Sequence, residues 1–235
     1  MIDRILYEDL HMIAVDKPAG VVVHPTYKNP DGTLLDSLRS AAVPRPSIVG
    51  RLDKWTSGIV VVAKSAGAHA ALQRALARPG AAKDYVAIVH GRVAEAQGRI
   101  DLPLHVDPQD RRRVVVAQTG GAPSVTLFER VRTSAAFSLL TIRPLTGRRH
   151  QIRAHLAAIG HPLVGDVVYG PDRQHARHAL HAARLTFTLP WLPSPEAPAG
   201  SDPGPTRVRP GSDLAKVCLE APIPGDFGLL LTLMS

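Results

Sequence analysis

The chain is poor in cysteine, in acidic residues and in long apolar runs, and these shortages exclude several classes of protein. Its 235 residues include one cysteine, Cys218, which excludes an intrachain disulfide and a zinc site built on several cysteines. No segment approaches the roughly 20 consecutive apolar residues of a membrane-spanning helix, and the N-terminus has no apolar run of signal-peptide length. We therefore expect a cytoplasmic protein with no membrane partner and no disulfide partner.

The shortage of acidic residues leaves the chain strongly basic. Lysine and arginine number 28 against 20 aspartates and glutamates, which gives a net charge of +8 and a pI near 10.1. Such a balance favours a polyanionic partner, although a merely basic protein is the alternative. Most of the positive charge is arginine, whose planar guanidinium suits bidentate phosphate contacts and stacking on bases.

Short strands outnumber helices in the pattern of apolar and turn-forming residues. Helices are expected over 33–42, from Ser65 to Pro79, and from Thr146 or Gly147 to about Ile159. Strands are expected within 2–23 and at 59–63, 85–89, 113–117, 125–131, 137–143, 185–189 and 217–220. Hairpin-length loops join many of these strands, which predicts an α+β fold with a mixed, mainly antiparallel sheet.

A charged triplet, Arg51-Leu52-Asp53, stands just ahead of the wholly apolar run Ile59 to Ala63. The run predicts a strand that is buried on both faces. Between them, Thr56-Ser57-Gly58 supplies two hydroxyls and a glycine, which can hold a tight turn rigid. From these residues alone, a structural ion pair at a strand end and the start of an active site both remain open.

Several segments, in order, resemble the motifs of the RluA-type pseudouridine synthases. GRLDKWTSGIVVVAK is similar to that family's signature of His-Arg-Leu-Asp, two variable residues and Thr-Ser-Gly. One position departs from it, because Gly50 stands where the family usually has histidine, and Trp55 is a bulky residue at a variable position. The other matching segments are DLHMIAVDKPAGVVVHP from Asp9, KDYVAIVHG from Lys83, LTGRRHQIRAHLAAIGHPLVGDVVYG from Leu145 and APIPGDF from Ala221.

The resemblance implies a pseudouridine synthase fold, which is a long, bent, mixed and mainly antiparallel sheet with flanking helices and a central cleft. We expect residues 1–235 to form a single catalytic domain of a compact member, without an N-terminal RNA-binding domain. Residues 190–212 contain seven prolines, which exclude a helix or a central strand and predict an exposed loop or insert. Arg207 and Arg209 in that segment are candidate RNA contacts, or simply solvated loop residues.

The resemblance also implies an activity, the isomerisation of a specific uridine in structured rRNA or tRNA to pseudouridine. The reaction needs a carboxylate near the sugar and the base, a dry pocket and a flipped-out nucleotide, but no metal or other cofactor. The family's catalytic aspartate corresponds to Asp53, its paired arginine to Arg153 and its active-site tyrosine to Tyr85. Attack by Asp53 on the base, attack on C1′ and a glycal route all remain open.

The same residues also have structural interpretations. Tyr85 could be a core residue of a strand, and Arg153 and Arg149 could form a solvated edge beside the apolar stripe of their helix. The triplet at 111–113, all arginine, could be a solvated hairpin end or a phosphate contact. From the motifs we expect RNA to contact Arg51, Thr56, Arg148, Arg149, His150 and Gln151.

Eleven histidines raise the possibility of a metal site. His150 and His155 are five residues apart, rather than four as in the helical zinc motif, and no glutamate follows His150. We expect no metal, no cofactor and a monomer. The alternative function is a catalytically inactive, basic RNA-binding protein of the same fold, and a metallohydrolase ranks third.

The glycine at position 50 leads to one further expectation. Glycine removes an imidazole from the catalytic loop and loosens its backbone. We expect Trp55 to compensate by packing over the gap, so that Gly50→His is tolerated and Trp55→Ala lowers activity.

Overall fold

The computed structural model describes residues 4–171, 175–191, 207–209 and 216–234. The chain divides into two compact units, which we describe separately. Unit 1 comprises residues 1–83 and 182–222, and unit 2 comprises residues 84–181 and 223–235. Most of the proline-rich segment at 190–212 lies outside the described residues.

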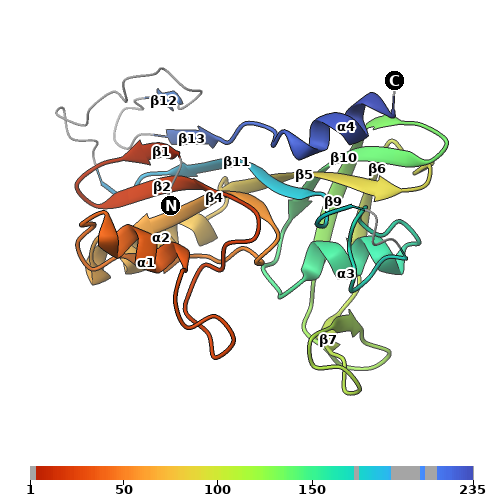
Figure 1. Ribbon diagram of the computed structural model, residues 1–235, viewed down its shortest axis with the longest axis horizontal. Coiled ribbons are helices and arrows are strands. Elements are labelled where there is room, and N and C mark those ends of the chain that lie inside the picture. Colours follow the sequence, from red (N-terminus) through yellow and green to blue (C-terminus); the bar gives the residue numbers. More distant parts are fainter. Residues whose placement is uncertain (1–3, 172–174, 192–206, 210–215, 235) are drawn as a thin grey trace. The chain divides into compact units, whose positions relative to one another are not determined.

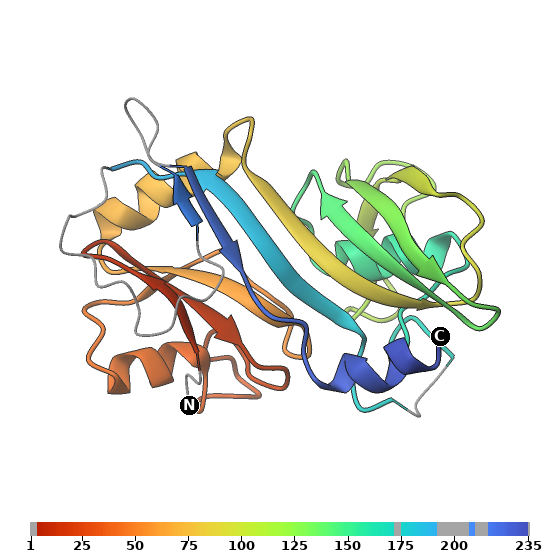
Figure 2. The same ribbon diagram turned by 90° about the horizontal axis from the view of Figure 1, so that it is seen from above.

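The sheet of unit 1 is built around strand β4 (Ser57–Ala63), in which every residue is buried. This confirms the prediction of a strand covered on both faces. Strand β2 (Met12–Lys17) pairs antiparallel with β4, β1 (Ile5–Glu8) pairs with β2, and β3 (Ser47–Val49) also pairs with β4. On the other side of β4 lies β11 (Leu180–Thr188), followed by β13 (Lys216–Glu220) and β12 (Arg207–Arg209). Figure 2 shows β11 and β13 running side by side.

Two helices of unit 1 begin at the caps that the sequence predicts. Helix α1 (Leu34–Ser40) starts with a capping box between Thr33 and Asp36. Helix α2 (Ala66–Ala77) starts at Ser65, whose hydroxyl accepts a hydrogen bond from the amide of Ala68. Its buried face packs on alternate residues of β4, and the two form one apolar core with β11 and β13; Figure 1 labels these elements.

Unit 2 contains an antiparallel run of four strands in the order β5-β10-β9-β6. Helix α4 (Asp226–Thr232) buries Phe227 and Leu230 against Ile88 of β5 and against Val164. A separate two-stranded hairpin is formed by β7 (Leu104–Val106) and β8 (Val114–Val116). The bounds of the four strands are β5 Ala82–His90, β6 Gln97–Asp101, β9 Val125–Thr133 and β10 Phe137–Pro144.

Helix α3 (Gln151–Ala158) begins later than the sequence predicts. The expected start at Thr146 or Gly147 is wrong because tertiary hydrogen bonds hold the preceding segment out of the helix. The amide of Leu145 donates to the carbonyl of Val125, and the hydroxyl of Thr146 accepts from the amide of Val125. His150 then adopts a left-handed conformation with φ 52°. The pattern of apolar and turn-forming residues did not predict β3, β6, β7, β12 or α4.

Gly58, the second residue of β4, provides a test of this packing. Its φ is +109°, and an added Cβ would lie 2.3 Å from the carbonyl oxygen of Ala182 on β11. Backbone strain and overpacking should together make Gly58→Ala less stable by about 2–6 kcal/mol in denaturant unfolding. The control is Gly67→Ala on α2, where nothing lies within 4 Å of the added Cβ. A Gly58→Ala protein as stable as this control would contradict the packing described for β4.

Candidate functional site

The loop between β3 and β4 carries Asp53. A hydrogen bond of 3.1 Å from the amide of Thr56 to the carbonyl of Asp53 closes a turn, and Thr56 and Ser57 are buried. Asp53 is half-buried, whereas Arg51 is exposed. The hydroxyl-rich turn that the sequence predicts is therefore present, and it presents the carboxylate from a well-defined backbone.

A buried lysine that the sequence analysis did not single out braces this loop. The ammonium of Lys17 donates to the backbone carbonyls of Pro18 at 2.8 Å, Val21 at 2.9 Å and Lys54 at 3.1 Å. The amide of Gly20 also donates to the carbonyl of Lys54. Lys17 has no exposed surface. Its ammonium therefore depends on these carbonyl oxygens in place of water, and one of them belongs to Lys54, the residue after Asp53.

The side chain nearest to Gly50 is Lys83, not Trp55. Gly50 has a φ of +87°, and an added Cβ would lie 3.1 Å from the Lys83 amine. Desolvation lowers the pKa of that amine. Trp55 lies instead against Gly20, where an added Cβ would meet its ring at 3.2 Å. The expectation that Trp55 fills the gap at Gly50 is therefore wrong. The expected tolerance of histidine there stays a prediction, and the positive φ of Gly50 opposes it.

His24 is a second residue of unit 1 that the sequence analysis passed over. Burial lowers its pKa, and the nearby charge of Arg51 lowers it further. The imidazole is therefore held neutral near pH 7. His24 lies in DLHMIAVDKPAGVVVHP, one of the segments that resemble the family. That resemblance could have indicated its position beside the Asp53 loop.

In unit 2, Arg153 of α3 forms a buried ion pair with Asp166. Its Nε and one terminal nitrogen donate to the two carboxylate oxygens at 2.7 and 2.8 Å, and the exposed fractions of the two side chains are 6% and 0%. Burial raises the pKa of Asp166, but the pairing with Arg153 and a bond from the amide of Val168 outweigh it and hold that pKa below its usual value. The interpretation of Arg153 as a solvated helix edge is therefore wrong.

Tyr169 connects this ion pair to the hairpin of β7 and β8. Its hydroxyl accepts from the amide of Val114 at 2.8 Å and lies 3.0 Å from Nδ1 of His150. The guanidinium carbons of Arg153 and Arg113 lie 5.1 and 5.7 Å from its ring centroid, within cation–π range. Tyr169 and Asp166 both lie in the quoted GDVVYG segment, but nothing in their spacing identified these partners.

The four expected RNA contacts at 148–151 are consecutive in the sequence, but they differ in how deeply they are buried. Gln151 is buried, and its carboxamide donates to Val125 and Thr126 and accepts from Thr146 and Arg148. These four hydrogen bonds use both donors and both acceptor positions of the carboxamide. Gln151 therefore stabilises the conformation of the loop at 145–150. Arg148 and Arg149 are exposed, while His150 is half-buried.

The candidate residues fall into two sets, one in each unit. Arg51, Asp53 and Thr56 share the loop before β4 in unit 1. Tyr85 is buried on β5 in unit 2, where it pairs in register with Ile142 of β10. The remaining candidates of unit 2 lie at the start of α3 and are Arg148, Arg149, His150, Gln151 and Arg153.

The family model described as RNA pseudouridylate synthase matches residues 11–158, which include the Asp53 loop and α3. The chain belongs to this family. A ribosomal large subunit pseudouridine synthase D from Nitrosomonas europaea is 45% identical over 202 residues, which cover 80% of this chain and 58% of the relative. A protein of the same name from Neisseria meningitidis serogroup A is 38% identical over 248 residues, covering 98% and 60%. The chain thus spans about three fifths of the length of these curated relatives.

Solved structures confirm the fold of this family member. Human RNA Pseudouridylate Synthase Domain Containing 4 superposes with a TM-score of 0.70 at 21% identity, covering 98% of this chain and 92% of that one. Domain Containing 1 gives a TM-score of 0.69 at 23% identity, covering 100% and 96%. The expected α+β pseudouridine synthase fold is therefore confirmed. No helix within the described ranges is long and apolar enough to span a membrane.

The buried pair gives a prediction that depends on pH. Asp166→Asn leaves Arg153 without its buried counter-charge, which should cost about 3–5 kcal/mol of unfolding free energy at pH 7. The folded pKa of Asp166 lies below its unfolded pKa, so the pair stabilises the protein above about pH 4 and loses its effect as the pH falls through the folded pKa. Denaturant unfolding should show the difference between wild type and mutant shrinking in acid.

The matched control is Asp101→Asn, because Asp101 forms an exposed pair with Arg99. Exposed pairs contribute little to stability, so this mutant should unfold like the wild type both at pH 7 and in acid. Equal losses for the two mutants at pH 7 would show that burial does not strengthen the Arg153–Asp166 pair.

A second prediction concerns Gly50. Gly50→His should lower the unfolding free energy by about 1–3 kcal/mol because the positive φ strains any side chain. Gly80→His is the control: Gly80 has a φ of +92° with nothing within 4 Å of an added Cβ, so it isolates backbone strain from the contact with Lys83. A Gly50→His protein with wild-type stability would overturn the backbone argument.

Proposed function

We propose that the protein is an RNA pseudouridine synthase that isomerises a specific uridine in structured RNA, with Asp53 as the catalytic carboxylate. The main support is that Asp53 stands at the family's catalytic position, on a loop that hydrogen bonds from Lys17 and Thr56 hold in place. The names of these relatives refer to the ribosomal large subunit, which supports rRNA over tRNA as the substrate.

In the proposed reaction the C1′–N1 glycosidic bond breaks, the uracil turns, and a C1′–C5 bond forms. The proton leaves C5 and N1 gains one, so that no oxidant or reductant is needed. Asp53 acts in its ionised form at the sugar or at the base, and Tyr85 stacks on the extruded uracil. The ionised carboxylate needs a nearby cation to offset its desolvation.

Arg153 is the proposed cation. A guanidinium carries five N–H donors, and the described bonds to Asp166 use two of them. Bonds to Asp166 are therefore compatible with a second carboxylate partner for Arg153, and Asp166 would hold the orientation of its guanidinium. We assign Asp166 as a positioning residue that fixes the orientation of the Arg153 guanidinium.

The residues proposed to serve RNA binding, some by direct contact and others through the shape of their loop, are Arg51, Thr56, Arg148, Arg149, His150 and Gln151. Exposed guanidiniums support direct phosphate contacts for Arg51 and Arg148. The hydrogen bonds of Gln151 and His150 support an indirect contribution, through the shape of the loop at 145–150. We further propose that residues 1–235 act as one catalytic domain, as a monomer, in the cytoplasm.

The alternative is an RNA-binding protein of the same fold that has lost the chemistry. Gly50 favours it, because a family imidazole is absent beside the catalytic loop. The two functions differ in one observable, the formation of pseudouridine in bound RNA.

Asp53→Asn tests the proposal. The amide keeps the shape of the side chain but removes the reactive charge, so isomerisation should fall below detection while RNA affinity changes little. The assay is carbodiimide mapping of a bacterial large-subunit rRNA transcript after incubation with purified protein. Asp101→Asn, an equal change on an exposed strand, serves as the control. Wild-type turnover in Asp53→Asn would show that the catalytic carboxylate has been misassigned.

A further inference from the structure

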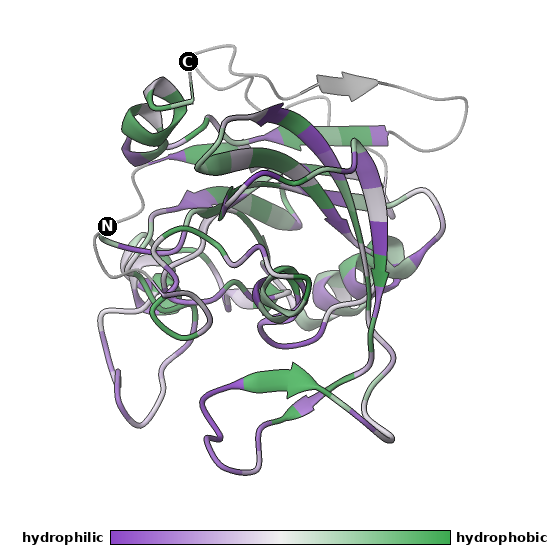
Figure 3. Cartoon of the chain, turned by 90° about the vertical axis from the view of Figure 1, so that its right-hand side faces the viewer, coloured by the Kyte–Doolittle hydropathy of each residue, from purple (hydrophilic) through white to green (hydrophobic). Residues whose placement is uncertain are grey.

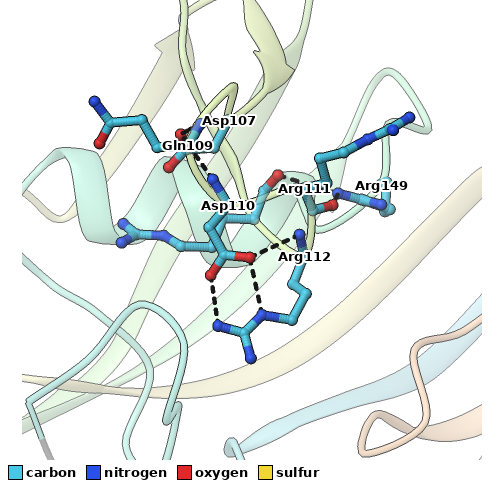
Figure 4. A network of polar contacts seen from close by, with 7 residues as sticks. Asp107, Gln109, Asp110, Arg111, Arg112 and Arg149 are labelled. Carbon is cyan, nitrogen blue, oxygen red and sulfur yellow. Dashed lines mark hydrogen bonds and ion pairs between the residues drawn. The ribbon is translucent and has the colours of Figure 1, made fainter.

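The arginines around the hairpin of β7 and β8 show how this protein accommodates most of its positive charge. At the bottom of Figure 3, the strands of this hairpin are apolar and the loop between them is hydrophilic. Figure 4 shows Arg112 of that loop bonded to Asp110 through two nitrogens. Arg149 donates to the carbonyls of Arg111 and Arg113. Solvent or a protein acceptor therefore compensates these charges.

Lys83, near the start of β5, is accommodated differently. The residue is half-buried, and desolvation lowers the pKa of its amine. Within the described ranges of the chain, this amine has no hydrogen bond and no ion pair. A desolvated charge without a partner costs folding free energy. Stability therefore gives no reason for a lysine at this position, and a ligand that supplies the missing partner does.

Gly50 keeps the space beside this amine open. A Cβ added to Gly50 would lie 3.1 Å from the Lys83 amine, and no other group outside the neighbouring residues lies within 4 Å of it. Gly50 is itself exposed, so a ligand can approach the amine across it from solvent. The φ of +87° strains any side chain at this position. The backbone conformation thus favours the residue that leaves the approach open.

The surroundings of Gly50 favour an anion as the ligand. Arg51 follows it directly and is exposed, so a second cation lies next to the approach. An anion would replace the lost hydration of the amine by a charge-assisted hydrogen bond. In an enzyme that acts on RNA, a phosphodiester group supplies both the negative charge and the acceptor oxygens.

We propose that Lys83 and Gly50 form a binding site for one phosphodiester group of the RNA, beside the loop that carries Asp53. The proposal deepens the function proposed above and rests on it for the identity of the ligand. Lys83 supplies the charge, and Gly50 supplies the space, at the position where the family usually has histidine. The departure from the family motif then serves substrate binding in this chain.

The first test is Lys83→Met, which keeps an unbranched side chain and removes the amine. Because the described residues offer this amine no partner, the unfolding free energy should stay the same or rise. Affinity for a bacterial large-subunit rRNA transcript should instead fall about tenfold or more. The slope of log affinity against log salt should become shallower by about 0.7–0.9, the contribution of one phosphate contact.

The control for this test is Lys216→Met, an equal loss of charge at an exposed position of β13. It should keep the wild-type affinity and slope. If Lys83→Met also keeps both, Lys83 does not bind RNA and the proposal is overturned.

The second test is a double-mutant cycle between Gly50 and Lys83. The methyl group of Gly50→Ala would fill the approach to the amine, so RNA binding should weaken in the wild-type background and change little further in the Lys83→Met background. Gly80→Ala matches the backbone strain, because Gly80 has a φ of +92° with nothing within 4 Å of an added Cβ, and it should not affect binding. Additive losses from Gly50→Ala and Lys83→Met would overturn the assignment of Gly50.

The third test distinguishes a phosphate of RNA from a free anion. Acetic anhydride acetylates unprotonated amines, and mass spectrometry measures the rate at each lysine. The bound transcript should slow acetylation of Lys83 but not of Lys216, and inorganic phosphate at an equal concentration of phosphate groups should slow it less. No protection by the transcript, or equal protection by inorganic phosphate, would contradict a site for RNA.

Isomerisation of the same transcript by the wild type separates this proposal from the proposed function. If pseudouridine forms and Lys83→Met binds the transcript like the wild type, the phosphate site fails alone. If no pseudouridine forms while the Lys83→Met and Gly50→Ala proteins behave as expected, the proposed catalysis fails and the site stands as an RNA contact.

Discussion

The buried pair of Arg153 and Asp166 is the interaction on which most of unit 2's candidate site depends. Both side chains are almost wholly buried, so each charge depends on the other for compensation. The same carboxylate accepts from the amides of Val168 and Tyr169, and it thereby shapes the turn that presents Tyr169. Through that tyrosine, the Arg153–Asp166 pair supports both the orientation of one guanidinium and the packing of the hairpin of β7 and β8.

Unit 1 holds its catalytic loop by a different means. Lys17 is as deeply buried as Arg153, but its ammonium donates to backbone carbonyls of two separate turns. The carbonyl oxygens offset part of the desolvation cost of the ammonium only while both turns keep their shape, so the buried charge stabilises the loop that carries Asp53. A desolvated cation thus organises each part of the proposed machinery, through a carboxylate in one unit and through main-chain oxygens in the other.

The arginine content of the chain does not form a uniform phosphate-binding surface. Arg153 and Arg149 donate hydrogen bonds to other groups of the protein. Arg130 donates to the carbonyls of Val93 and Ala94. Arg51 and Arg111 expose their charge. In the proposed function the first group sets geometry and the second supplies affinity, a division that net charge alone does not reveal.

The sequence was enough to predict those elements that depend on residues close together along the chain. The apolar run of β4, the caps at Thr33 and Ser65 and the family motif around Asp53 all lie within a few neighbouring residues, and the sequence by itself determined them. Tertiary structure decided the rest: the late start of α3, Lys83 beside Gly50, and the partners of Arg153 and Tyr169. Those outcomes depend on hydrogen bonds, steric contacts and desolvation between segments distant along the chain, and such interactions exist only once the backbone has brought the segments together.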